Sequence, residues 1–357
     1  MFPFYLLFFA AIFFAWACPP KSGKWFLFFL MLAMSMFRGM NVGGDDTIAY
    51  YNNSFDHEFS LESTLSYDLE FLFVWWTNFI REHHLNPRWC LYSLSLIQFI
   101  FLYLSSKRFK VGLEKVLFFF LLLNYYYLSL EISRQLASNA ILLYAYSFLI
   151  EEDKKKYWFF PLVILAASIH LTSILALPFF VCILYKPPTF KRLGNLGFVI
   201  VAVVFIFMQS YGAKFSEMLI SRVDLLAFYQ HLGEETEAAS GSSLVGFIVQ
   251  LIKIEFIYYV YIKIARSYHH LIANILFVSL VMTIVLSPIV GNINRMVILA
   301  GIVQVIAYPL LLEQTYIPRK EKQLFLISVT VFWGAVCLRD LAAGNYFLAP
   351  YYMTLPF

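Results

Sequence analysis

The sequence predicts an all-α fold, specifically a polytopic integral membrane protein, and three observations lead to that fold class. Of the 357 residues, 61% are hydrophobic and 13% are charged, whereas soluble domains carry roughly 45–50% apolar and roughly 25% charged residues. Apolar runs near the ~20 residues needed to cross a bilayer recur along the whole chain. Basic residues gather in short loops between these runs. Since no soluble block stands beside them, we expect residues 1–357 to form a single integral membrane domain.

The first apolar runs and the basic loops predict how the chain crosses the membrane. Residues 2–18 lack a basic n-region and are followed almost at once by another run, so we interpret them as a retained helix. Lysine and arginine mark cytoplasmic loops. The loops with this character are KSGK (21–24), KRFK (107–110), EEDKKK (151–156), KPPTFKR (186–192), KIAR (263–266) and PRKEK (318–322).

An even number of crossings must separate consecutive cytoplasmic loops, but three apolar runs lie between residues 24 and 107. The middle run, residues 67–83, starts with YDLE and ends with REHH. We predict that it lies in the interface or re-enters. This gives about twelve transmembrane helices, both termini outside, and an outer polar segment at residues 38–66. A full crossing by residues 67–83 would reverse the sidedness of everything before it.

Two hairpins are too short for two ordinary spans. Residues 157–185 leave about 15 residues for each arm, against the usual ~20, so the tip near His170 should lie below the outer surface. The same argument applies to residues 114–150, whose midpoint carries Glu131 and Arg134. Both tips predict a sunken pocket open to the outside. A long polar loop, residues 212–243, would cover it as a lid.

The ionisable residues predicted to lie outside are mixed in sign and rich in arginine. An arginine at membrane depth is costly unless it is paired or hydrated, and its planar fork grips phosphate in a bidentate way. The candidates for binding a diphosphate are Arg38, Arg134 and Arg295, the acid–base candidates are Asp45, Asp46, Glu70 and His170, and further substrate-binding candidates are Tyr50, Tyr51 and Arg222.

Each candidate also has a structural interpretation. Arg38 could anchor a helix at the lipid headgroups, and Asp45 and Asp46 could form a turn and a helix N-cap. Glu70 could fix an interfacial helix, and Arg134 could pair with Glu131. His170 could be a hydrogen-bonded core histidine, and Arg295 could cap a helix. The paired aspartates are not matched by a second acidic motif, and the cysteines have no metal-ligand spacing, so we expect no metal and no cofactor. The net charge of +4 is spread over short loops, which argues against nucleic acid as a partner.

The order of several motifs resembles the EpsG-type, Wzy-like bacterial polysaccharide polymerases of O-antigen or capsule synthesis. These motifs are R-x-x-x-x-G-G-D-D-T-x-x-Y-Y (38–51), YDLEFLF (67–73), S-R-Q-x-A (133–137), A-A-S-I-H-x-T (166–172) and N-x-N-R (292–295). The positions that match the family are Arg38, Asp45 or Asp46, Glu70, Arg134, His170 and Arg295. One departure is the doubled aspartate, which leaves open which of Asp45 and Asp46 counts.

The resemblance implies a GT-C-like glycosyltransferase at the outer face of the bacterial inner membrane. Such a protein moves a growing glycan from undecaprenyl diphosphate onto a new lipid-linked repeat unit. It therefore implies undecaprenyl-diphosphate-linked oligosaccharide and the bilayer as partners, together with a chain-length regulator protein. The alternatives are an O-antigen ligase, a lipid-linked oligosaccharide flippase or exporter, and an acyltransferase built around His170.

The predicted sidedness can be measured by cysteine labelling in intact cells. A membrane-impermeant thiol reagent should reach cysteines introduced at residues 41–65 and 212–243, because both segments are predicted to face outward. Cysteines introduced at residues 151–156 should react only after the membrane is permeabilised, because this basic loop is predicted to be cytoplasmic. Outside labelling of residues 151–156 would reverse the topology.

Overall fold

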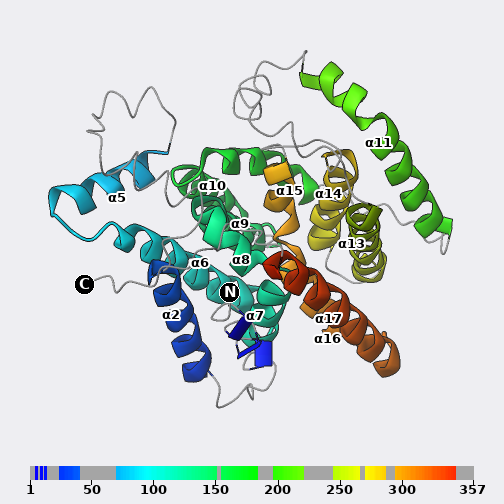
Figure 1. Cartoon of the computed structure of the whole chain (residues 1–357), viewed down its shortest axis with the longest axis horizontal. Coiled ribbons are helices and arrows are strands. Elements are labelled where there is room, and N and C mark those ends of the chain that lie inside the picture. The colour runs from blue at the N-terminus through cyan, green and yellow to red at the C-terminus, as the bar shows by residue number, and fades with distance from the viewer. Residues whose placement is uncertain are drawn as a thin grey trace. The chain divides into compact units, whose positions relative to one another are not determined.

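The computed structural model describes residues 5–6, 9–10, 12–13, 24–40, 70–150, 154–183, 196–220, 244–265, 270–286 and 294–342. Within these ranges every regular element is a helix (Figure 1). Three described helices have the length and apolar character to cross a membrane, at Arg88–Arg108, Val245–Ile264 and Arg319–Asp340. The described residues therefore bear out an all-α fold compatible with a membrane protein. The count of about twelve spans and the GT-C-like class remain predictions.

The chain divides into two compact units, Met1–Phe180 with Ile317–Phe357, and Val181–Tyr316. The described helices of the first unit are α2 (Lys24–Met40), α5 (Phe71–Glu82), α6 (Arg88–Arg108), α7 (Leu113–Leu122), α8 (Tyr125–Glu131), α9 (Ser133–Phe148), η1 (Lys154–Trp158), α10 (Phe159–Ala167), η2 (Leu171–Ile183, which ends just past the boundary) and α17 (Arg319–Ala342). Those of the second are α11 (Leu196–Ile220), α13 (Leu244–Ile264), α14 (His270–Leu286), α15 (Asn294–Gly301) and α16 (Gln304–Glu313).

Helix α9 is the centre of the first unit. Its side chains are buried on nearly all sides, as expected of a helix enclosed by others. It packs against α6, α8, α10 and η1, and α2 in turn packs against α6 (Figure 1). The enclosed position of α9 means that any polar residue at its ends must find a partner within the protein.

Contacts between helix ends show which of these helices run parallel and which run antiparallel. Arg108 at the end of α6 donates a hydrogen bond from Nε to Ser147 Oγ near the end of α9, at 2.8 Å, so α6 and α9 run parallel. Arg38 near the end of α2 bonds Ser133 at the start of α9, so α2 runs the other way. One end of the unit therefore holds the starts of α6 and α9, and the opposite end holds the basic residues 107–110.

Several elements of this unit are too short to cross a bilayer alone. Helix α5 has 12 residues, which is ~18 Å of length against a hydrocarbon core of ~30 Å. The hairpin expected around His170 consists of α10 with nine residues and η2 with 13, and its turn lies at residues 168–170. The hairpin centred on residues 131–134 is interrupted between α8 and α9. The short elements thus end where the sequence predicted sunken tips.

In the second unit, α13 packs against α11, α14 and α16, and α15 packs against α14. Helix α11 continues to Ile220, so residues 212–220 are helical, and the expected loop at 212–243 is wrong for that part. The segment AKFSEMLI (213–220) is composed mainly of helix-compatible residues, which explains the extension. The remaining residues of that loop, including Arg222, lie outside the described ranges.

Candidate functional site

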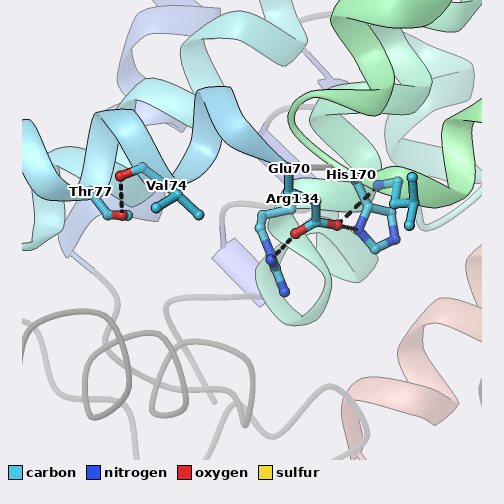
Figure 2. Close-up of polar contacts among 6 residues, drawn as sticks. Glu70, Val74, Thr77, Arg134 and His170 are labelled. Atoms are coloured by element: carbon cyan, nitrogen blue, oxygen red, sulfur yellow. Dashed lines mark hydrogen bonds and ion pairs between the residues drawn. The ribbon is translucent and has the colours of Figure 1, made fainter. Parts of the chain in front are cut away.

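The carboxylate of Glu70 joins three parts of the first unit. One oxygen, Oε2, accepts an ion-paired hydrogen bond from Arg134 at the start of α9. The other oxygen, Oε1, lies 2.9 Å from His170 Nδ1 and accepts a hydrogen bond from the backbone amide of Leu171 at 3.0 Å. Figure 2 shows Glu70 between the two side chains. We call Glu70, Arg134 and His170 the Glu70 cluster.

Two helix ends meet at this cluster and satisfy each other's backbone groups. The amides of Leu72 and Phe73, in the first turn of α5, donate to the carbonyl of Ser168 at 3.0 and 3.2 Å. The first amides of a helix and its last carbonyls lack partners within the helix, and here the end of α10 supplies the start of α5. Ser168 is two residues before His170, and Glu70 directly precedes α5. The contact between the end of α10 and the start of α5 therefore brings Glu70 beside the imidazole.

The environment of Glu70 favours its ionised form. Burial by itself would raise the pKa of this carboxyl group, but the hydrogen bond from His170, the charge of Arg134 and the Leu171 amide outweigh burial. The pKa of Glu70 is therefore lowered from its ordinary value of 4.5. An ionised Glu70 accepts hydrogen bonds and donates none, which matches the three donors around it.

Arg134 occupies a position that disfavours a cation. It is the second residue of α9, and the N-terminus of a helix carries partial positive charge. The carboxylate of Glu70 offsets this cost, and the ring of Phe73 lies 4.7 Å from the guanidinium carbon. The Arg134 side chain is 25% exposed, so this permanent charge is held in place and is still reachable from outside the protein.

Arg38 lies on the same end of the unit but is enclosed by protein. Its Nε and Nη2 donate to Ser133 Oγ at 3.2 and 2.7 Å, and Ser133 Oγ in turn donates to the Ser129 carbonyl at 2.8 Å. Arg38 is 1% exposed, so a phosphate would reach it only after a rearrangement. The Ser133 that binds Arg38 directly precedes Arg134 in α9, so the two arginines contact the same turn of that helix.

The predicted site residues fall into three groups. The structure brings Glu70, Arg134 and His170 together and holds Arg38 on the residue next to Arg134. Arg295 is the second residue of α15 in the second unit, and its side chain lies outside the described residues. Asp45, Asp46, Tyr50, Tyr51 and Arg222 also lie outside the described ranges. The chemical roles assigned to all of these residues stay predictions.

The sequence interpretation assigned no role to Ser133, Phe73 or the backbone amide of Leu171. All three lie within motifs quoted above. Their closeness in sequence to Arg134, Glu70 and His170 was the one sign that they could belong to the site. Their partners, however, are 61 to 101 residues away in the chain. Spacing along one helix cannot reveal such contacts.

Comparison with known protein families gives a match over nearly the whole chain. The model described as the EpsG family matches residues 24–353, which covers the whole Glu70 cluster and nearly the whole chain. Comparisons with curated proteins and with solved structures find no match.

Replacing Ser133 by alanine should destabilise the protein by about 1.5–3 kcal/mol, because a buried arginine loses a hydrogen bond to a hydroxyl. The measurement is the thermal unfolding of purified protein in detergent. Ser138→Ala is the matched control, because Ser138 is also buried in α9 but bonds only the Gln135 carbonyl, at 2.8 Å. Equal losses in the two variants would show that the Arg38–Ser133 contact adds no stability of its own.

Acid should weaken the fold through Glu70. The pKa of Glu70 is lower in the folded state than its ordinary value of 4.5. Ionisation of Glu70 therefore stabilises the fold at pH values above 4.5, and this contribution is lost as the pH falls through the folded pKa. Glu70→Gln should therefore melt at a lower temperature at pH 7 and lose less further stability on acidification than the wild type.

The matched control for the acid experiment is Glu82→Gln, which alters an exposed glutamate at the other end of α5. This variant should keep the acid sensitivity of the wild type. If Glu70→Gln and the wild type lose stability in parallel between pH 6 and pH 3, Glu70 does not carry this part of the pH dependence.

Proposed function

The chain belongs to the EpsG family, and from this premise we propose that it is a polysaccharide polymerase of the Wzy type, a GT-C-like glycosyltransferase. It transfers a growing glycan from undecaprenyl diphosphate onto a new lipid-linked oligosaccharide repeat unit. The reaction takes place at the outer face of the bacterial inner membrane. The observation that carries this proposal is the Glu70 cluster, which holds a fixed, partly exposed arginine beside an imidazole in an apolar helical unit.

The reaction requires a stabiliser for the leaving group. When the bond between the sugar and the diphosphate breaks, negative charge develops on the phosphate oxygens. An arginine that is already held in position stabilises this charge without reorganising. Arg134 fits the role because Glu70 and Phe73 fix its guanidinium, and 25% of its side chain is exposed.

Several expectations from the sequence belong to the same proposal. Arg295 is a further candidate for binding the diphosphate, and Arg38 becomes one after a rearrangement that exposes it. Asp45 and Asp46 are acid–base candidates, and Tyr50, Tyr51 and Arg222 are candidates for binding the substrate. A chain-length regulator is a partner protein. The arrangement in the first unit supports a cluster that faces outward, because the basic residues 107–110, which are predicted to be cytoplasmic, lie at the opposite end of α9.

The direct test is to incubate the purified protein with a defined lipid-diphosphate repeat unit and to separate the products by chain length. Longer lipid-linked chains are expected. Movement of the substrate across vesicles without extension would indicate a flippase, and transfer to a lipid A acceptor would indicate a ligase.

Arg134→Ala should abolish extension in this assay, and in cells it should leave single repeat units made and exported. Arg295→Ala should behave in the same way, because Arg295 is proposed to bind the same diphosphate. Arg108→Ala is the matched control, since Arg108 pairs with Ser147 and Phe148 roughly 20 Å along α9 from the cluster. Full-length glycan from the Arg134→Ala variant would refute the leaving-group role.

A further inference from the structure

The two nitrogens of His170 have different surroundings. Nδ1 lies 2.9 Å from Glu70 Oε1, and an ionised carboxylate can only accept a hydrogen bond. In the neutral imidazole the proton must therefore sit on Nδ1, and Nε2 carries the lone pair. Among the described residues, no hydrogen bond of His170 through Nε2 is formed, so this nitrogen is the one available to a substrate.

Glu70 is poorly suited to take a proton itself. Both of its oxygens are engaged, Oε2 by Arg134 and Oε1 by His170 and the Leu171 amide. The carboxylate also lies deeper than its neighbours, with 10% of its side chain exposed against 16% for His170 and 25% for Arg134. Its geometry suits a group that orients the imidazole, with the imidazole between it and the substrate.

The backbone holds His170 firmly in this orientation. Its amide donates to the Ala166 carbonyl at 2.9 Å, and its carbonyl accepts from the Ser173 amide at 3.1 Å. The residue thus stands at the turn between α10 and η2, bonded to both. A base that is positioned in advance needs no search for the productive geometry.

We propose that Nε2 of His170 is the general base of chain extension, with Glu70 as the positioning residue that fixes its tautomer. This proposal rests on the proposed polymerase function. The acceptor sugar's hydroxyl oxygen attacks the anomeric carbon of the donor glycan as its proton passes to Nε2. The bond between that carbon and the diphosphate oxygen breaks, and the electron pair leaves with the lipid diphosphate. The imidazolium then releases the proton to solvent.

The cluster places the two tasks of the reaction on either side of one carboxylate. Arg134 on Oε2 stabilises the leaving diphosphate, and His170 on Oε1 receives the proton, so both act within the dimensions of one sugar and its phosphate. The carboxylate also stabilises the imidazolium that forms. Direct attack assisted by a single base inverts the configuration at the anomeric carbon. The new glycosidic linkage should therefore have the opposite anomeric configuration to the donor.

The deciding variant is His170→Asn. The asparagine amide can donate to Glu70 in the way that Nδ1 does, but it has nothing in the place of Nε2. The variant should keep the melting temperature of the wild type and lose roughly 10²- to 10⁴-fold in kcat for extension of a defined lipid-diphosphate repeat unit, with little change in KM. The acid limb of the wild-type pH–rate profile should disappear from its residual activity.

A second measurement does not depend on turnover. Diethyl pyrocarbonate modifies unprotonated imidazole nitrogens, and mass spectrometry can compare His170 with the exposed His83 and His84. The lipid-diphosphate repeat unit should slow modification of His170 and leave the other two unchanged. Glu70→Gln, which allows either tautomer, should alter the modification rate of His170.

The possible results separate this proposal from the polymerase function. If the wild type extends chains and His170→Asn extends them equally fast, the function stands and the base assignment is wrong. Extension without protection of His170 from modification also overturns it. If the wild type transports or ligates its substrate without extending it, the polymerase function and this role fall together, while the labelling still measures the coupling of Glu70 and His170.

Discussion

The first unit depends on a carboxylate that is held by donors from two distant segments. Glu70 immediately precedes α5, and its partners stand at the starts of α9 and η2. Burying an ionised carboxylate costs several kcal/mol unless it is paired and hydrogen-bonded, and each of these donors reduces that cost. The same carboxylate offsets the charge of Arg134 at the positive end of α9. Each charge therefore reduces the cost of placing the other.

Short helices are what allow the cluster to form inside an apolar unit. A helix that crossed the whole bilayer would carry its ends to the headgroups, where water satisfies them. Helices α5, α8, α10 and η2 end earlier, and their terminal amides and carbonyls must be satisfied within the protein. For the first amides of α5 and η2, the Ser168 carbonyl and the Glu70 carboxylate supply these partners. Interrupted helices therefore place polar groups among apolar side chains, where continuous helices would not.

Composition and loop charge were sufficient to predict an all-helical membrane protein, because both follow from the cost of placing polar groups in lipid. Counting residues per hairpin arm also placed breaks near His170 and Arg134, as the structure has them. Helical spacing favours neighbours one turn apart and so suggested Glu131 as a partner for Arg134, but the side chain of Glu131 lies outside the described residues. Spacing did not suggest the ion pair of Arg134 with Glu70. Contacts between distant segments are set by packing, which no local pattern encodes. The burial of Arg38 was unpredictable for the same reason.

The position of Arg38 and Glu70 has a consequence for the chain between them. Arg38 is bonded to Ser133 and Glu70 to Arg134, so consecutive residues of α9 fasten both borders of residues 39–69. Asp45 is seven residues beyond Arg38, so its Cα lies within ~25 Å of Arg38 in any conformation. Such tethering makes encounters between this segment and the cluster independent of protein concentration, as in an intramolecular reaction.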